Sequence, residues 1–477
     1  MNPTASSRAA VIAGGLWVGL GFVGQQGISF LRTLVLARLL TPEDFGLVGI
    51  VMLTLFAGFM LTEWGIESAL IQRSELRPEA VDTAGTLMFL RGCGLFLLIQ
   101  VAAPWIAAGF DRPDATSFLR VGAVSFLLVT VPAVPATLLL RDLRFRDRTM
   151  LDTGRDVCGL VCAIVLAWWL GNAWALLLGL LFGQLAAAIA VWFLRPIRPR
   201  WRLDRAALRE YGQFGRHLYA SGLMAYVVTK GDDIVVGKVR GVRELGQYQV
   251  VFGIAEMLTR GLSETVNKVV FPAYSRLTGE GRSLATAFDE VWRLHLLLLL
   301  PIASVLILFP VDSVALLLGS QWLTAAVPFA VLVLAETLRA LAAACGVLIL
   351  AGGRTVYLSR IKLVEVVCFG LLIVPMTTRW GMSGAAGCLV AVYTLSLIGH
   401  VVGARQVERA VGAVLARSGE PVLVAAVLSG VAWGLVVGMQ MPAAVGAVAW
   451  LLLWSGYGWY RQGGLLIMLW DSIRARP

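Results

Sequence analysis

The chain has 477 residues, of which 58% are hydrophobic and 14% are charged. Soluble globular domains carry about 25% charged residues, so this composition excludes a soluble protein. The formal net charge of +11 would suggest nucleic-acid binding in a soluble chain. Here the basic residues collect in short connections between apolar segments, so no nucleic-acid partner is expected.

Apolar runs that are long enough to cross a bilayer core of about 30 Å recur along most of the chain. They predict an all-α integral membrane protein of about 14 transmembrane helices. The first run continues past Arg32 without a cleavage pattern, so we interpret it as a retained helix rather than a signal peptide. The predicted spans are 11–33, 46–63, 84–108, 117–140, 151–170, 173–194, 214–237, 247–270, 291–311, 325–351, 356–376, 383–404, 421–439 and 443–460.

Basic residues mark cytoplasmic connections, and they collect in every second connection between the predicted spans. Only the connection 238–244 departs from this pattern, with three basic residues on the opposite side. Both termini are therefore predicted to be cytoplasmic. The basic stretches 141–150 and 195–210 are expected to lie on anionic lipid headgroups.

The chain matches itself at an offset of about 200 residues, which indicates an internal duplication. Residues 37–46 match 237–246, with Gly46 opposite Gly246, and Cys158 matches Cys368 further on. Six helices in each half predict two lobes in one orientation, related by a pseudo-two-fold axis along the membrane normal. The predicted domains are an N-lobe at 1–195, a cytoplasmic linker at 196–212, a C-lobe at 213–405, and two added helices with a tail at 406–477. Two such lobes favour an alternating-access transporter over a channel.

Several segments resemble the Wzx-like polysaccharide-transport flippases, which belong to the multidrug, oligosaccharidyl-lipid and polysaccharide (MOP) exporter superfamily and have a MATE-like fold. They are LARLLTPEDFGLVGI at 36–50, WGIESALIQR at 64–73, KGDDIVVGKVRGVRELGQY at 230–248, VFPAYSRL at 270–277 and LLGSQW at 317–322. Family members often carry Asp where this chain has Trp64, which leaves the substrate details open.

The resemblance implies a bacterial inner-membrane protein that is a transporter rather than an enzyme. It would flip polyprenyl-pyrophosphate-linked oligosaccharide repeat units from the cytoplasmic to the periplasmic leaflet for exopolysaccharide, capsule or O-antigen export. It would act as a monomer beside other polysaccharide assembly proteins. One alternative is cation-coupled multidrug efflux. Another is a membrane polysaccharide polymerase, although no outside loop exceeds about a dozen residues on these spans.

No nucleotide-binding loop, serine-hydrolase elbow or metal-ligand spacing occurs in the sequence. No cofactor is therefore expected, and the energy for transport is expected to come from Na⁺ or H⁺ coupling or from substrate supply. Charged side chains within membrane spans are costly, so each is a candidate for function, with a neutralised helix–helix pair as the structural alternative. The spans hold eight cations and nine acids, so the sequence alone does not predict a cationic cavity.

Arginine offers a planar fork of donors that stays charged in a low dielectric, which suits pyrophosphate. The predicted pyrophosphate contacts are Arg32, Arg91, Arg260, Lys268 and Arg339. The predicted sugar contacts are Gln25, Gln26, Tyr226, Asn267 and Gln184. The predicted ion-coupling residues are Lys230, Asp232, Asp233, Glu256 and Glu336, with Lys230 and Asp233 on one helix face at a spacing of three.

Overall fold

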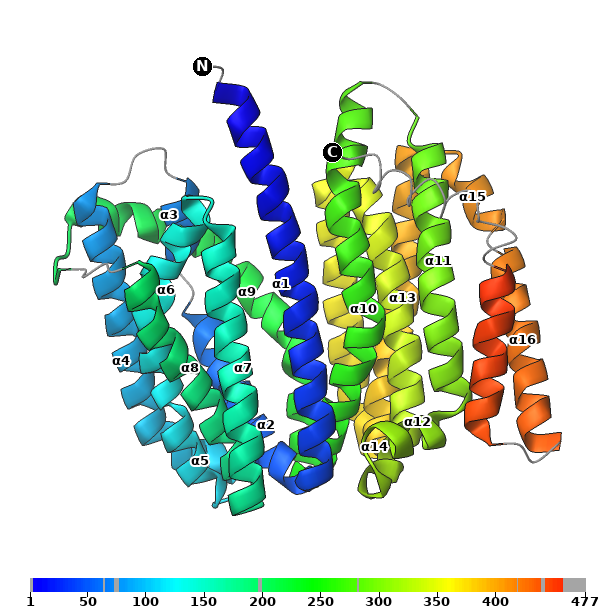
Figure 1. Ribbon diagram of the computed structural model, residues 1–477, viewed down its shortest axis with the longest axis horizontal. Coiled ribbons are helices and arrows are strands. Elements are labelled where there is room, and N and C mark those ends of the chain that lie inside the picture. Colours follow the sequence, from blue (N-terminus) through cyan, green and yellow to red (C-terminus); the bar gives the residue numbers. More distant parts are fainter. Residues whose placement is uncertain are drawn as a thin grey trace. The chain divides into compact units, whose positions relative to one another are not determined.

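The computed structural model describes residues 3–62, 65–72, 77–195, 200–280, 283–417, 419–438 and 442–457. Within these ranges every regular element is a helix (Figure 1). The predicted all-α fold class is therefore confirmed. Two compact units, Met1–Val250 and Val251–Pro477, divide the chain.

Among the described residues, 8 helical segments are long and apolar enough to cross a membrane. They are Pro42–Leu61, Pro78–Gly109, Ala115–Arg141, Trp174–Leu194, Ala285–Leu308, Ser320–Ala351, Thr355–Val407 and Val411–Gly434, with a shorter apolar helix at Ala443–Tyr457. A multi-pass membrane protein is thus confirmed, while the exact number of spans stays a prediction.

The helix α14 (Thr355–Val407) has 53 residues, which corresponds to about 80 Å at the usual rise and is far too long for one span. Its backbone leaves the helical region at Gly381, where φ is 60° and ψ is −141°. Glycine has no Cβ and adopts this positive φ without the strain of other residues. The two halves then run side by side, and the Tyr357 hydroxyl donates to the Gly399 carbonyl at 3.0 Å. These halves correspond to the predicted spans 356–376 and 383–404.

The first unit holds nine helices of the described chain and the start of a tenth. They are α1 (Pro3–Leu39), α2 (Pro42–Leu61), α3 (Ile66–Gln72), α4 (Pro78–Gly109), α5 (Ala115–Gly122), α6 (Val124–Arg141), α7 (Phe145–Leu170), α8 (Trp174–Leu194), α9 (Arg205–Arg240) and α10 (Val242–Gly279). The helix α9 packs on α2, α3 and α4 of this unit. The sequence assigns residues from 213 onward to the C-lobe, and that division of the chain into lobes stays a prediction.

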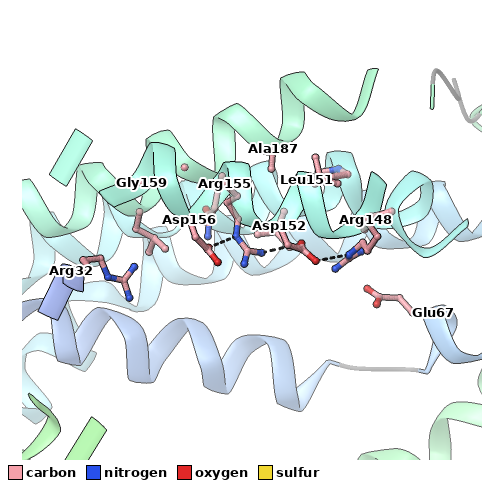
Figure 2. A pocket seen from close by; sticks show the side chains of 16 residues that line it. Arg32, Glu67, Arg148, Leu151, Asp152, Arg155, Asp156, Gly159 and Ala187 are labelled. Carbon is pink, nitrogen blue, oxygen red and sulfur yellow. Dashed lines mark hydrogen bonds and ion pairs between the residues drawn. The ribbon is translucent and has the colours of Figure 1, made fainter. Parts of the chain in front are cut away.

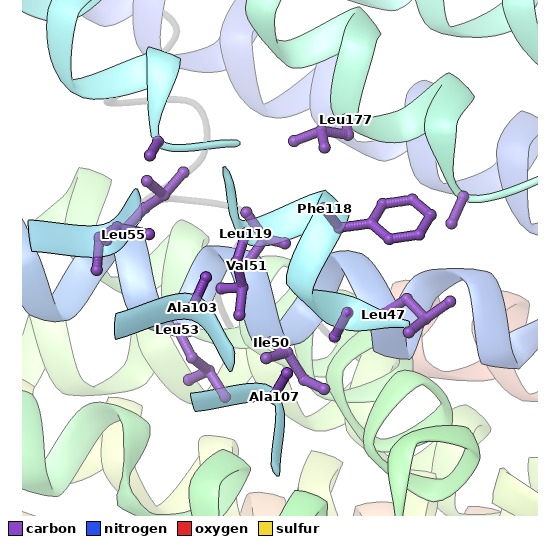
Figure 3. Packing of buried hydrophobic residues seen from close by; sticks show 14 of the residues in the cluster. Leu47, Ile50, Val51, Leu53, Leu55, Ala103, Ala107, Phe118, Leu119 and Leu177 are labelled. Atoms are coloured by element: carbon purple, nitrogen blue, oxygen red, sulfur yellow. The ribbon is translucent and has the colours of Figure 1, made fainter. Parts of the chain in front are cut away.

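The core of the first unit is mostly aliphatic, with buried Phe118 and Phe126, and it includes side chains of α2, α4, α5 and α8 (Figure 3). Ile50 and Val51 of α2 are fully buried, and Leu119 and Leu177 reach them from α5 and α8. A capping box starts α2, because Asp44 Oδ2 accepts from the Thr41 amide at 2.9 Å and Thr41 Oγ1 accepts from the Asp44 amide at 3.3 Å. The sequence TPED thus sets where α2 begins.

The start of α2 and the start of α10 cross at two glycines that the sequence duplication pairs. A Cβ on Gly46 would lie 1.9 Å from the Val242 carbonyl oxygen, and a Cβ on Gly246 would lie 1.9 Å from the Pro42 carbonyl oxygen. Each contact becomes the other when its two residue numbers are shifted by 200, since 46 and 242 correspond to 246 and 42. Contacts across a two-fold axis are reciprocal in the same way. The crossing supports the duplication, and only glycine allows the two backbones to approach so closely.

The second unit holds the rest of α10 and the helices that follow it. They are α11 (Ala285–Leu308), α12 (Pro310–Leu317), η1 (Ser320–Ala325), α13 (Ala326–Ala351), α14, α15 (Val411–Arg417), α16 (Gly419–Gly438) and the short apolar helix Ala443–Tyr457. Its main core gathers aromatic and small side chains around Phe288, Trp292 and Cys345. A separate cluster packs Trp450 and Trp454 on Phe309 at the end of α11.

Candidate functional site

A cavity of about 330 Å³ lies inside the first unit, between α1, α6, α7 and α8 (Figure 2). Apolar side chains of α6 and α8 form much of its wall. The charged and amide side chains that line it are Arg32, Glu67, Arg148, Asp152, Arg155, Asp156 and Gln184.

The helix α7 places a row of alternating charges along this cavity. Arg148, Asp152, Arg155 and Asp156 follow at spacings of four, three and one, so they share one side of the helix. Asp152 Oδ2 accepts from Arg148 Nε at 2.7 Å, and Asp156 Oδ1 accepts from Arg155 Nε at 2.9 Å. Arg155 Nη1 also lies 3.7 Å from Asp152 Oδ1. Both arginines of the row are therefore neutralised by neighbours on their own helix.

Arg32 reaches the cavity from α1, beyond the Asp156 end of this row (Figure 2). Leu36 and Leu40 anchor α1, because both are buried against Ala163 and Ala167 of α7. Within the described ranges the Arg32 guanidinium makes no hydrogen bond or ion pair, although Asp156 is near enough to attract it electrostatically. The cavity lining holds three arginines and three acids. It is thus not cationic as a whole, but it presents one arginine whose donors are available.

Glycine allows α8 to approach α7 beside this row. A Cβ on Gly183 would lie 2.7 Å from the Arg155 carbonyl oxygen, and a Cβ on Gly179 would lie 2.9 Å from the Ala163 Cα. The next residue, Gln184, lines the cavity, and its buried Oε1 accepts no hydrogen bond from the described part of the chain. Buried polar atoms are normally satisfied, so this amide is suited to a polar ligand or to water.

The other predicted contacts of the first unit lie outside the lining of this cavity. Arg91 Nη1 donates to the Thr62 carbonyl at 3.4 Å and so caps the end of α2. Gln25 and Gln26 precede Arg32 on α1, and the lining includes neither of them. The Tyr226 ring stacks on Phe56, with ring centroids 5.9 Å apart.

The acidic pair of α9 is buried, with Asp232 3% and Asp233 4% exposed. Lys230 Nζ lies 3.1 Å from Asp233 Oδ2, so the predicted shared face of these two residues is confirmed. The Tyr248 hydroxyl donates to Asp232 Oδ2 at 2.9 Å, while Asp232 Oδ1 is buried and accepts nothing from the described residues. No group of three or more metal-ligating side chains occurs among those residues.

The second unit holds the remaining predicted residues. Glu336 is fully buried on α13, and Arg339 Nη1 lies 3.3 Å from its Oε1. The Arg339 guanidinium also lies 5.3 Å from the centre of the Tyr393 ring, and Glu256 attracts it electrostatically. This arginine is therefore compensated on several sides, unlike Arg32.

Asn267 Nδ2 donates a hydrogen bond to Ser263 Oγ at 3.4 Å. Nε2 of the buried His295 lies 3.0 Å from the same oxygen. This polar group joins α10 to α11 within the second unit. The side chains of Arg260 and Lys268 lie outside the described residues.

The α7 row was not predicted from the sequence. Arg148 lies in the basic stretch 141–150 that is expected on lipid headgroups, and Arg155 and Asp156 are among the charges of the predicted span 151–170. The spacing of 148, 152 and 155 on one helical face was the available signal. Glu67 lay near a predicted span end and gave no signal of a cavity.

The model of a family described as polysaccharide biosynthesis protein matches residues 35–327. The chain is 22% identical over 399 residues to the lipopolysaccharide biosynthesis protein WzxC of Escherichia coli (strain K12). The aligned region covers 83% of this chain and 80% of WzxC. The fold of this chain is similar to that of the lipid II flippase MurJ in an inward closed conformation, with a TM-score of 0.75 and 11% sequence identity. The match covers 94% of this chain and 99% of the MurJ chain. An inward-facing MATE family transporter of the MOP superfamily matches with a TM-score of 0.58, 16% identity, and coverage of 82% and 95%.

Proposed function

Because the chain belongs to the polysaccharide biosynthesis protein family, we propose that it flips polyprenyl-pyrophosphate-linked oligosaccharide repeat units across the bacterial inner membrane. The resemblance to the Wzx-like polysaccharide-transport proteins is confirmed, as is the MOP fold. The similar folds of a lipid II flippase and of a MATE family transporter support a membrane transporter rather than an enzyme. The repeat unit would move from the cytoplasmic to the periplasmic leaflet by alternating access, for exopolysaccharide, capsule or O-antigen export.

Arg32 carries the proposal. It lines a cavity inside a membrane-spanning helical unit, and its guanidinium makes no hydrogen bond or ion pair within the described ranges. A guanidinium binds phosphate oxygens through two parallel hydrogen bonds, and these are among the strong contacts available to a protein. Arg148 and Arg155 already share their charge with aspartates, which makes Arg32 the arginine of this cavity best suited to a pyrophosphate.

The α7 row and Gln184 suit the sugar part of the same ligand. Carboxylates accept hydrogen bonds from hydroxyl groups, and the guanidinium and amide groups donate to them. A charge-balanced row of this kind binds neutral hydroxyls without adding net charge to the cavity. The remaining predicted pyrophosphate contacts are Arg91, Arg260, Lys268 and Arg339, and the remaining predicted sugar contacts are Gln25, Gln26, Tyr226 and Asn267.

Flipping by the purified protein in proteoliposomes tests the proposal. The substrate is a labelled polyprenyl-pyrophosphate oligosaccharide, and a membrane-impermeant sugar-cleaving enzyme reports its transfer. Hydrogen bonds to charged groups contribute about 1.5–3 kcal/mol, so Arg32→Ala should slow flipping about tenfold or more. Arg32→Lys keeps the charge but loses the planar fork, and should fall between Arg32→Ala and the wild type.

Arg276→Ala is the matched control, because that side chain is 83% exposed and should leave flipping unchanged. Wild-type flipping by Arg32→Ala would contradict the assignment of Arg32. If the wild-type protein fails to flip this substrate, the flippase proposal itself is refuted.

Coupling to Na⁺ or H⁺ is part of the same proposal. The buried carboxylates Asp232 and Asp233 of α9 support it in the first unit, as does Glu336 with Glu256 in the second. Flipping should respond to an imposed Na⁺ or pH gradient, and Asp233→Asn should weaken that response more than it changes flipping without a gradient. A response that is equal in the variant and the wild type would exclude Asp233 from coupling.

The inner-membrane location, the cytoplasmic termini, the monomeric state and the association with other polysaccharide assembly proteins are also proposed. The alternation of basic connections supports the orientation of the termini.

A further inference from the structure

A second cavity, of about 280 Å³, lies between the two halves of α14 in the second unit. Two hydrogen bonds join the halves along it. The Tyr357 hydroxyl donates to the Gly399 carbonyl at 3.0 Å, and Ser396 Oγ donates to Glu365 Oε1 at 2.6 Å. Tyr357 and Glu365 are eight residues apart, so the cavity extends about 12 Å along the helix.

The walls of this cavity are aliphatic and open to the outside of the unit. Val364 is 49% exposed, Leu395 is 42% exposed and Ile398 is 56% exposed. The same surface continues along α14 to Leu371, which is 70% exposed. A water-filled route would require polar walls, whereas a continuous exposed aliphatic surface on a membrane-spanning helix faces lipid chains.

One end of the cavity is basic. Arg360 lines it, is exposed, and forms no ion pair within the described part of the chain. Lys362 is 58% exposed and lies one turn before the buried Glu365, with Nζ 2.6 Å from Glu365 Oε2. Lys362 and Ser396 together compensate the Glu365 carboxylate, so that carboxylate does not repel an anion at the mouth of the cavity. The predicted topology places the connection 352–360 on the cytoplasmic side, where anionic lipids gather.

We propose that this groove binds one anionic glycerophospholipid of the cytoplasmic leaflet. The lipid phosphate contacts Arg360, and one acyl chain lies along Val364, Leu395 and Ile398. Basic pockets between membrane helices are suited to such headgroups, and the aliphatic walls are suited to an acyl chain. Bilayer phospholipid surrounds this surface at far higher concentration than any lipid-linked saccharide, so mass action favours it as the occupant. The inference is independent of the flipped substrate.

Binding of phosphatidylglycerol to the purified full-length protein in detergent, measured by native mass spectrometry, tests the groove. One basic residue near a headgroup contributes enough to change affinity about fivefold, so Arg360→Gln should weaken binding by that factor. Arg379→Gln is the matched control on the same helix, since Arg379 lies away from the groove over Trp380. It should bind as the wild type does. Leu395→Trp places a larger side chain in the groove and should also weaken phosphatidylglycerol binding.

The wild-type protein supplies further measurements that need no variant. Phosphatidylglycerol should bind better than phosphatidylcholine, and added salt should weaken its binding because part of the attraction is electrostatic. Equal binding of the two lipids, or equal phosphatidylglycerol binding by Arg360→Gln and the wild type, would overturn the proposal. Displacement of phosphatidylglycerol by equimolar polyprenyl phosphate would also overturn it, because the groove would then belong to the lipid carrier.

Discussion

The close crossing of α2 and the start of α10 within the first unit can be tested by substitution of one glycine. In Gly246→Ala the new Cβ would lie 1.9 Å from the Pro42 carbonyl oxygen and 3.1 Å from the Gly46 Cα. Ordinary van der Waals contact begins at 3.4 Å. The helices must therefore separate by about 1.5 Å at this point, the difference between 3.4 and 1.9. Neither neighbouring atom belongs to a side chain that could rotate away.

Overpacking of this kind costs about 1–3 kcal/mol, because backbone must shift to relieve it. Alanine in place of glycine in a helix also contributes up to about 1 kcal/mol of stability, and this would mask part of the loss. Gly253→Ala is a control for that contribution, because Gly253 lies on the same helix and a Cβ there meets nothing within 4 Å. The difference between the two variants isolates the cost of the crossing.

Thermal unfolding of both variants in the same detergent measures this difference. We expect Gly253→Ala to unfold at or above the wild-type midpoint and Gly246→Ala to unfold several degrees below it. Unfolding of membrane proteins is often irreversible, so equal scan rates are needed. The same midpoint for Gly246→Ala and Gly253→Ala would refute the close backbone approach.

Two further outcomes follow from hydrogen bonds in the first unit. Tyr248→Phe removes the donor 2.9 Å from the buried Asp232 carboxylate and should lower the free energy of unfolding by about 1–3 kcal/mol in chemical denaturation. Tyr226→Phe removes a longer hydrogen bond, 3.4 Å from the hydroxyl to the Leu53 carbonyl, and should cost less than half as much. Equal losses in the two variants would contradict this ranking. The hydrogen bond from Arg112 holds the pKa of Asp114 below its usual range, although burial opposes this shift. This stabilisation is present above the unfolded pKa of about 3.9 and is lost as pH falls through the folded value. The wild type should therefore lose more thermal stability than Asp114→Asn between pH 6 and about pH 3, mainly at low salt, and parallel losses would exclude the pair.

The fold class was accessible from the sequence because hydropathy is a local property. Runs such as 173–194 and 325–351 are apolar over a length that only a membrane-spanning helix satisfies, and the helices Trp174–Leu194 and Ala326–Ala351 coincide with them. The pairing of Lys230 with Asp233 was also accessible, since a spacing of three residues on one helix fixes their proximity.

The cavity was only partly accessible from the sequence. Arg32 and Gln184 were selected as polar residues within apolar spans, and both line it. Glu67 lies on the short helix α3, and no local pattern joins it to α7. Its place in the lining depends on how α3 packs against α6.

Three arginines within apolar helices looked alike in the sequence, and the tertiary structure separated them. Arg91 meets the Thr62 carbonyl from another helix, and Arg339 lies against Tyr393 in addition to Glu336, whereas Arg32 opens into a cavity. From the sequence alone we could predict that the chain spans the membrane, that it contains an internal duplication, and which polar residues are costly in the spans. Which of those charges are compensated became visible in the folded chain, because compensation depends on groups that are distant in the chain and close in space.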